Sequence, residues 1–277
     1  YLLRAYGRWT GLDQTIKRGE YRLRVGLTPA TLLSLLQSGK VVSYAVTLPE
    51  GITLSKAISI LAATDVLATE ITGADDPRIA ELIAPQVVPE GLFLPETYRF
   101  ERGDSDWQVL SRAYGALHKV LAQEWQDRAG ELPYETPYEA LIMASIIERE
   151  TGVPSERSEI AGVFVRRLQK RMRLQTDPTV IYGLGQGFDG NLRRKHLADE
   201  NNPYNSYRHH GLPPSPIALV GRAAIHAALH PAPGTTLFFV AKGDGSHQFS
   251  TTLEEHERAV RKYQLKRRQD YRSTPEK

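Results

Sequence analysis

The sequence predicts an α+β protein, with a small α/β module in residues 1–75 followed by a larger mixed α+β domain in residues 76–277. Three observations support this fold class. The N-terminal part contains an internal repeat, the middle of the chain has two long helical patterns, and the C-terminal third is rich in loop-forming residues. With 277 residues and 41% hydrophobic content, the chain is long enough to bury a sizeable core.

The internal repeat lies within the first 65 residues and has an offset of 25 residues, which aligns the Gly-Leu-Thr triplet at 26–28 with the Gly-Ile-Thr triplet at 51–53. Each copy has a strand pattern, a turn and then an apolar helical pattern. Tyr21–Val25 and Tyr44–Leu48 are the predicted strands, and the threonine of each triplet is the predicted N-cap. We therefore expect the two copies to pack together as one small module.

Two later segments have helical patterns. Residues 107–125 carry apolar side chains at helical spacing, and residues 138–151 are apolar on nearly every side, which predicts a mostly buried helix. Gly152 and Pro154 should end the second helix, and Ser155 should cap the next one. Beyond residue 172 the composition favours loops, with residues 236–240 as the clearest strand.

Charge and motifs exclude several classes of function. The formal net charge is only +3, from 35 basic and 32 acidic residues, and we expect no nucleic-acid partner because such proteins usually carry a dense basic stripe. The chain has no cysteine, which excludes thiol catalysis and cysteine-ligated metals. It also lacks a Walker A loop, a Rossmann fingerprint and a Gly-x-Ser-x-Gly elbow. We therefore expect no cofactor.

The histidines raise the question of a metal. His226 and His230 are spaced i, i+4 on a predicted helix, an arrangement that could bind zinc. No acid accompanies them in the expected place in the sequence. A surface or core pair is therefore favoured, and no metal is expected.

The position of Glu150 makes it a candidate for acid–base chemistry. It follows an apolar helical run and falls in the last turn of that helix, and both burial and the negative helix end disfavour a carboxylate anion. A carboxylic acid that stays protonated near neutral pH can donate a proton to a glycosidic leaving group. A solvated glutamate paired with Arg149 or Arg157 is the alternative.

Glu148 competes with Glu150 for the same role. At about 100° per residue the two lie roughly 200° apart around the helix, so they cannot both face one cleft. This geometry excludes a cooperating pair but does not choose between the two residues.

Two polar segments could line a sugar site. The first, residues 174–182, places amide, hydroxyl, carboxylate and phenol groups close together. The second, residues 201–207, has a similar composition. In the first, Asp177 precedes a proline, which favours an extended backbone. Turns with self-satisfied hydrogen bonds are the alternative. The candidate substrate-binding residues are Gln175, Thr176, Asp177, Tyr182, Asn205 and Tyr207.

A series of motifs, in this order, resembles the YceG-like endolytic murein transglycosylases, and the resemblance covers most of the chain. Each motif is weakly specific alone, and together they are strong. They are GEYR at 19–22, LPEG at 48–51, EGLFLPETY at 90–98, ASIIERET at 144–151, VFVRRL at 163–168, MRLQTDPTVIYG at 172–183, PYNSY at 203–207, GLPP at 211–214 and HQF at 247–249.

The resemblance implies both a fold and an activity. The repeat would be a LysM-like module, and residues 76–277 would be a catalytic transglycosylase domain. The family's catalytic glutamate is the second acid of its Glu-x-Glu-Thr motif, which corresponds to Glu150 rather than Glu148. The activity would be endolytic cleavage of the MurNAc–GlcNAc β-1,4 bond of peptidoglycan strands in cell wall synthesis or remodelling, leaving 1,6-anhydro-MurNAc ends.

The resemblance also implies a location and partners. Family members are expected to be single-pass proteins of the bacterial inner membrane, with the part that corresponds to this chain in the periplasm. The longest apolar stretch, residues 140–147, is far shorter than the ~20 residues that a membrane span needs. Because the chain starts without methionine, we expect an N-terminal anchor that is missing from it. Peptidoglycan strands are the expected partner, and peptidoglycan synthases are further candidates.

Two alternatives stay open. A hydrolytic muramidase would use Asp177 as a second carboxylate and release a reducing end. A non-catalytic scaffold would bind glycan through the LysM-like module without cleaving it.

Overall fold

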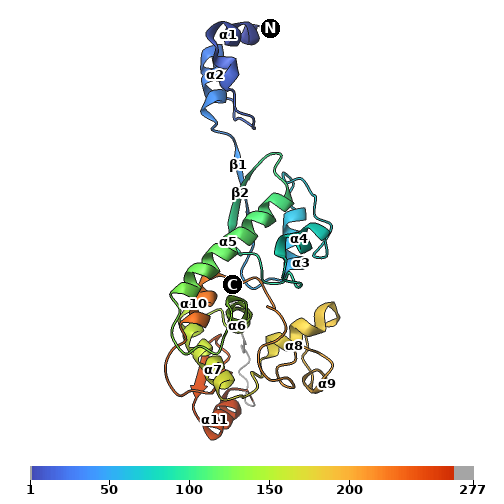
Figure 1. The fold of residues 1–277 in the computed structure, drawn as a ribbon, viewed down its shortest axis with the longest axis vertical. Coiled ribbons are helices and arrows are strands. Elements are labelled where there is room, and N and C mark those ends of the chain that lie inside the picture. The colour runs from blue at the N-terminus through green and yellow to red at the C-terminus, as the bar shows by residue number, and fades with distance from the viewer. Residues whose placement is uncertain (1, 265–277) are drawn as a thin grey trace.

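The computed structural model describes residues 2–264, and its helices and small sheets confirm an α+β fold (Figure 1). The α-helices are α1 (Leu2–Thr10), α2 (Pro29–Ser38), α3 (Leu54–Ala62), α4 (Pro77–Ile83), α5 (Asp106–Gln126), α6 (Pro137–Glu150), α7 (Arg157–Gln169), α8 (Asp177–Leu184), α9 (Arg194–Ala198), α10 (Arg222–Leu229) and α11 (Leu253–Tyr263). The strands are β1 (Ser43–Thr47), β2 (Thr97–Glu101), β3 (Phe238–Ala241) and β4 (His247–Ser250). Short 3₁₀ turns are η1 (Leu12–Thr15), η2 (Pro154–Glu156) and η3 (Gly185–Gly187).

Helices α1 and α2 stand apart from the other elements and are joined to them through β1 (Figure 1). As predicted, Thr28 caps α2 through its hydroxyl. Gly39 ends the helix in the left-handed conformation. The predicted strand Tyr21–Val25 is wrong, because this segment is not paired with any strand. Without a neighbouring strand its alternating side chains have no sheet face to pack on, and Val25 is fully exposed.

The second copy of the repeat forms as predicted, with β1 followed by α3 and Thr53 as the N-cap. Strand β1 pairs in antiparallel register with β2, from Ser43 opposite Glu101 to Thr47 opposite Thr97. Helix α3 packs on α5, whereas α2 packs on η1 and α1, so each copy has its own main packing partners. The predicted domain boundary near residue 75 stays a prediction, and the β1–β2 ladder joins residues on its two sides.

The core is built around α6, which packs against α10, α7, α5 and α8. The helix starts with a capping box in which Thr136 and Glu139 satisfy each other's backbone N–H groups, and with a proline in the first turn. Every residue from Ala140 to Glu148 is buried, which confirms the predicted buried helix. The hydroxyl of Ser145 donates to the Ile142 carbonyl and accepts from the Ile217 N–H at 3.0 Å. This apolar packing fixes where the last turn of α6 ends.

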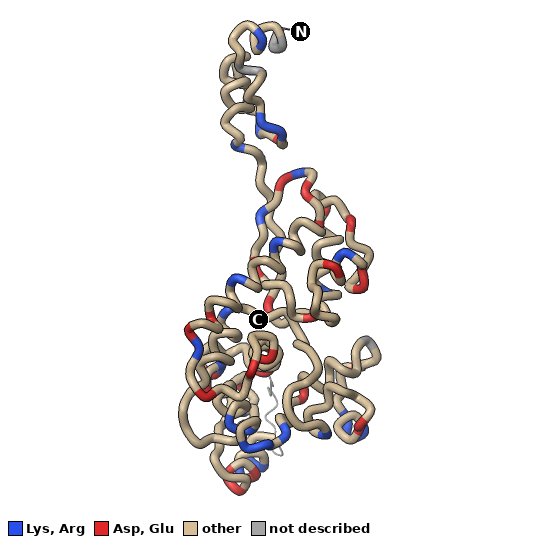
Figure 2. The backbone as a smooth tube through the Cα atoms, viewed as in Figure 1, with Lys and Arg blue, Asp and Glu red and all other residues tan. Residues whose placement is uncertain are grey.

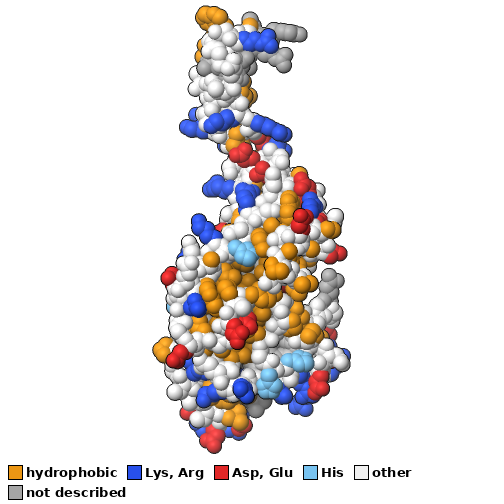
Figure 3. Space-filling view, viewed as in Figure 1, with side chains coloured by type: hydrophobic (Ala, Val, Ile, Leu, Met, Phe, Trp, Pro, Cys, Tyr) orange, Lys and Arg blue, Asp and Glu red, His pale blue; other side chains and the backbone are white. Residues whose placement is uncertain are grey.

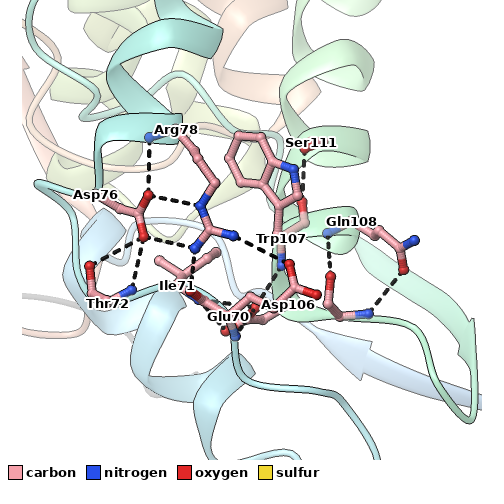
Figure 4. A network of polar contacts seen from close by, with 10 residues as sticks. Glu70, Ile71, Thr72, Asp76, Arg78, Asp106, Trp107, Gln108 and Ser111 are labelled. Carbon is pink, nitrogen blue, oxygen red and sulfur yellow. Dashed lines mark hydrogen bonds and ion pairs between the residues drawn. The ribbon is translucent and has the colours of Figure 1, made fainter.

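A buried polar network ties the segment before α4 to the start of α5 (Figure 4). Asp106 is fully buried and accepts hydrogen bonds from the backbone N–H groups of Glu70, Ile71 and Trp107. Arg78 pairs with Asp76 at 2.9 Å and lies 5.5 Å above the Trp107 ring. The network holds this irregular segment in place by satisfying buried backbone donors that no strand partner would satisfy.

Two helix starts differ from the predictions. Ser155 does not cap α7, because the turn η2 leads directly into the helix at Arg157. Asp177 is not extended but is the first residue of α8, and Thr176 takes the extended conformation instead. A proline in the first turn of a helix is tolerated because the N–H that it lacks would have no partner there.

The C-terminal strands β3 and β4 form an antiparallel pair, from Phe238 opposite Ser250 to Ala241 opposite His247, close to the predicted strand at 236–240. Helix α11 packs on both strands. Residues 265–277, the end of the predicted larger domain, lie outside the described part of the chain. Within residues 2–264, none of the helices combines the length and apolar character that a membrane crossing requires. Apolar side chains gather over the middle of the face in Figure 3.

Candidate active site

The last turn of α6 carries Glu150, which is half-buried. Neither arginine that the sequence offered as a partner is bound to it. Arg149 donates to the Gly51 carbonyl at 2.9 Å, and Arg157 lies 3.5 Å from Glu148. The hydrogen bond that Glu150 accepts comes from the Thr176 hydroxyl, at 2.7 Å.

Glu148 points to a different part of the molecule, as the helical geometry predicted. Its carboxylate is buried, pairs with Arg157, and accepts a hydrogen bond from the Gly221 N–H at 3.2 Å, just before α10. A carboxylate held in this way ties α6 to the start of α10. The structure therefore gives Glu148 a packing role and leaves Glu150 as the acid next to the polar segment at 175–177.

The Thr176 hydroxyl is held in place by a buried group of hydroxyls. The Thr176 N–H donates to the Ser206 hydroxyl at 3.0 Å, and the Thr176 carbonyl accepts from Thr179 at 2.8 Å. The hydroxyls of Thr179 and Ser206 lie 2.8 Å apart. These contacts fix the start of α8 against residues 205–207, so the Thr176 side chain meets Glu150 with little freedom to move.

Burial raises the pKa of Glu150 above its usual range, and the charge of Asp177 adds to this effect. The Thr176 hydrogen bond and the charges of His247 and Arg167 lower the pKa, but burial is the largest effect. Glu150 is therefore an acid that holds its proton to a higher pH than a solvated glutamate does. It also has neighbours that can stabilise its ionised form.

Two basic side chains near Glu150 are held in place by their other contacts. Arg167 on α7 is buried and donates to the carbonyls of Leu237 and Leu174, at 2.7 and 2.8 Å. His247 on β4 is also buried, and its Nδ1 lies 2.8 Å from Oε2 of Glu156. Both therefore supply positive or polar character beside Glu150 from fixed positions. Neither was predicted, because their roles depend on contacts between distant segments.

Three of the predicted binding residues lie next to Glu150 or its immediate neighbours. Thr176 contacts it directly. Asp177 is exposed and accepts a 2.7 Å hydrogen bond from the hydroxyl of the half-buried Tyr207. Burial raises the pKa of Tyr207, and the charge of Asp177 contributes to this rise. The phenol is therefore a neutral donor at physiological pH.

Gln175 and Asn205 have different environments. The exposed Gln175 has a left-handed backbone, with φ of 52°, and its side-chain oxygen lies 3.4 Å from Arg167. Asn205 is fully buried, and its amide donates to three backbone carbonyls, including that of Asp199 at 2.6 Å. Asn205 thus shapes the loop that carries Tyr207. A direct contact of Gln175 or Asn205 with sugar stays a prediction.

Tyr182 contacts a carboxyl that was not predicted as part of the site. Its hydroxyl donates to Glu90 at 3.4 Å, and its ring packs edge-on against Tyr204 at 4.8 Å. Burial raises the pKa of Glu90 to about 7, although it accepts a hydrogen bond from the Leu54 N–H at 2.9 Å. The signal that could have found it is an acid directly before the apolar residues of the EGLFLPETY motif. The next residue, Gly91, has a φ of 78° and lies so close to Pro216 that a Cβ would collide with it.

A second cluster of ligand-type side chains involves α5 and α10. One oxygen of Glu124 and one ring nitrogen each of His226 and His230 lie within 4.8 Å of one another. The sequence argument against a metal was the lack of a nearby acid. The tertiary structure brings that acid from 102 residues away.

Together these features define a class of protein: an α+β protein in which a half-buried glutamic acid with a raised pKa lies at a helix end, accepts a hydrogen bond from a threonine hydroxyl, and interacts with the charges of an arginine and a histidine. Basic and acidic residues are mixed over most of the described chain, whereas the part around α1 and α2 carries mainly basic residues (Figure 2). The model of the YceG-like family matches residues 1–262, and the chain belongs to this family.

Known proteins with related sequences and folds agree with this assignment. The chain is 37% identical over 174 residues to the endolytic murein transglycosylase of Bacillus subtilis, covering 63% of this chain and 48% of that one. It is 27% identical over 279 residues to the endolytic murein transglycosylase of Streptococcus pneumoniae serotype 2, covering 88% and 50%. The crystal structure of a putative YceG-like protein from Listeria monocytogenes has a TM-score of 0.66 and 32% identity, covering 93% of this chain and 88% of that one. The chain spans about half the length of the curated relatives it matches.

Proposed function

We propose that this chain is the catalytic part of a lytic transglycosylase that cleaves the MurNAc–GlcNAc β-1,4 bond of peptidoglycan. The cleavage is endolytic and leaves 1,6-anhydro-MurNAc ends, in cell wall synthesis or remodelling. The observation that carries the proposal is Glu150, a half-buried acid with a raised pKa at the end of α6, bonded to Thr176. Family membership and the names of the two relatives support it.

Glu150 first acts as a general acid. In its protonated form it donates its proton to the oxygen that bridges C1 of MurNAc and C4 of GlcNAc. The bond from C1 to that oxygen breaks, which frees the C4 hydroxyl and leaves positive charge at C1. The Thr176 hydroxyl, together with the charges of His247 and Arg167, stabilises the carboxylate that Glu150 becomes.

Glu150 then acts as a general base. Its carboxylate accepts the proton from the C6 hydroxyl of the same MurNAc, and the C6 oxygen bonds to C1. The 1,6-anhydro ring closes, no water is consumed, and Glu150 is protonated again. Hydrolytic glycosidases generally need a second carboxylate to activate water or attack C1, whereas this route needs only one.

Digestion of purified sacculi by Glu150→Gln tests the proposal. We expect cleavage to fall by at least about 10²–10⁴-fold, because the variant cannot transfer a proton in either step. Glu81→Gln, which removes a negative charge from an exposed position on α4, is the matched control and should cleave normally. Normal cleavage by a folded Glu150→Gln protein would contradict the proposal.

Mass spectrometry of the same digests distinguishes the two reaction types. Anhydro ends support the transglycosylase, and products heavier by one water support the muramidase that uses Asp177. The contact between Asp177 and Tyr207 favours a positioning role for this carboxylate. Long internal fragments early in the digestion would indicate endolytic cleavage, whereas a steady release of disaccharides would contradict it.

The proposal includes glycan binding by a LysM-like module in residues 1–75. Its support is the family resemblance and the pair of β1 and α3, since the first predicted strand does not form. Glycan pull-down with Glu150→Gln measures binding separately from cleavage. If the wild-type protein binds glycan but does not cleave it, the scaffold alternative is favoured.

We also propose that the full-length protein is anchored in the bacterial inner membrane by one N-terminal span, with these residues in the periplasm. The support is the family resemblance alone. Protease accessibility in spheroplasts tests it, because only a periplasmic domain is digested before lysis. Peptidoglycan synthases are the partner class, and in vivo crosslinking would detect them.

A further inference from the structure

We propose that Glu124, His226 and His230 form a binding site for a divalent transition metal, with Zn²⁺ as the natural occupant. The site joins the last turn of α5 to the end of α10 and is separate from the acid–base chemistry of Glu150. Mixed imidazole and carboxylate ligands are the set that Zn²⁺ takes in proteins.

The three ligand atoms are already close to a metal-binding arrangement. They lie within 4.8 Å of one another, and tetrahedral Zn²⁺ with bonds near 2.0–2.1 Å needs separations of about 3.3–3.5 Å. The rings of His226 and His230 are stacked, with centroids 4.1 Å apart and planes inclined by 19°. Metal binding therefore requires the two rings to turn toward one point and the three ligand atoms to approach one another, which side-chain rotation provides.

Contacts within the cluster and with nearby backbone orient the ligands. The Glu124 carboxylate is nearly buried, with its side chain 8% exposed, and its Oε2 lies 2.8 Å from Nδ1 of His226. The ring nitrogens of His230 lie 3.1 and 2.8 Å from the carbonyl oxygens of His226 and Asp127. When one nitrogen of His230 binds the metal, the other keeps its carbonyl partner, which is how metal-binding histidines are usually held.

The site is also accessible. The side chain of His226 is 58% exposed, and the three ligands line a surface hollow of about 760 Å³ between α5, η2 and α10. Metal can therefore enter from solvent, and water or another small ligand can take the fourth position. Arg222 competes for Glu124, with its Nε 2.7 Å from Oε1, but its side chain is 62% exposed and can turn to solvent.

Zinc titration of the purified, EDTA-stripped protein tests the proposal, with binding followed by calorimetry and thermal unfolding followed by circular dichroism. We expect one Zn²⁺ per chain and a higher Tm with the metal, because a ligand that binds only the folded state stabilises it. The double variant His226→Gln/His230→Gln should lose affinity at least about tenfold and lose the zinc-dependent rise in Tm. His209→Gln, an exposed histidine outside the cluster, should behave as the wild type.

Arg222→Gln is an independent variant for which zinc affinity should change in the opposite direction to that of the double variant. Without the competing guanidinium, Glu124 is freer to bind, so zinc affinity should rise. His226 is exposed on α10 and His230 is half-buried directly after it, so the Tm of the double variant is measured with and without zinc, and only the zinc-dependent change tests the proposal. Equal zinc affinity in the wild type and the double variant, or no effect of zinc on the Tm of the wild type, would overturn the proposal, whatever the cleavage assays show.

Discussion

The Thr176 hydroxyl donates a 2.7 Å hydrogen bond to Oε2 of Glu150, which connects the start of α8 to the end of α6. This bond opposes the effect of burial. Burial raises the pKa of Glu150, and the bond favours the ionised form. In the proposed mechanism Glu150 gives up and takes back one proton in each cycle, and this needs both influences because either protonation state would otherwise be too stable.

Thr176→Val should move the pH dependence of cleavage to higher pH. The substitution keeps the shape of the side chain but removes the hydrogen bond, so the pKa of Glu150 should rise further. Since the protonated acid starts the reaction, the alkaline limb of the kcat/KM profile should shift upward. Thr176→Ser keeps a hydroxyl and should leave the profile in place. An unshifted profile in the valine variant would show that the bond does not control this acid.

Asp177→Asn should move the alkaline limb of the kcat/KM profile to lower pH. The charge of Asp177 raises the pKa of Glu150, so its removal should lower that pKa and bring the alkaline limb to lower pH. The amide oxygen can still accept the Tyr207 hydrogen bond. If Asp177 were the second carboxylate of a muramidase, the rate would instead fall by about 10²–10⁴-fold at every pH.

Glu150→Gln should change how stability depends on pH. Because the pKa of Glu150 is raised in the folded state, the folded protein holds this proton after the unfolded chain, with a pKa near 4.5, has lost it. The wild type therefore loses stability as the pH rises from the unfolded pKa to the folded one, and the neutral glutamine avoids this loss.

Thermal unfolding at several pH values measures the difference. The Tm of Glu150→Gln relative to the wild type should increase as the pH rises above about 4.5, whereas below that pH the relative Tm should not vary with pH. A difference that is the same at every pH would mean that Glu150 is not titrating with a raised pKa.

Asp106→Asn should destabilise the fold by about 1–3 kcal/mol, because an amide has one acceptor oxygen in place of two and no charge to strengthen its hydrogen bonds. With the amide oxygen in the position of Oδ1, which accepts from Glu70, Ile71 and Trp107, the NH₂ group replaces Oδ2 and faces the Ile71 N–H. Chemical denaturation measures the loss. Asp65→Asn, at an exposed position, is the control and should change stability by less than about 0.5 kcal/mol. A loss in Asp106→Asn no larger than in the control would show that the network in Figure 4 adds little to stability.

Local sequence predicted the helices with strong patterns and caps. Thr28, Thr53 and the apolar run of α6 each act within one turn or one helix, so their effects can be read without knowing the fold. The strand at Tyr21–Val25 failed for the opposite reason. A strand is stable only when a partner lies beside it, and its alternating pattern cannot supply that partner.

The candidate site also combines features that follow from local sequence with features that depend on contacts between distant segments. Position in a helical pattern made Glu150 a candidate, and helical geometry showed that Glu148 cannot face the same cleft, but the choice between the two came from the family resemblance. The contacts of Glu90, Arg167 and His247 could not be predicted, because each joins segments that are far apart in the chain. The acid beside His226 and His230 was missed in the same way.

The α+β class, the main helices, the acid at the end of α6 and the motifs of the YceG-like family could all be read from the order of residues. The contacts between distant segments required the folded chain, because they decide which hydroxyl meets that acid, which charges shift its pKa, and that Glu124 meets two histidines on another helix. Distance along the chain explains this division. Capping and helical periodicity act between neighbours, whereas hydrogen bonds, burial and metal-ligand geometry depend on which distant segments the packed core brings together.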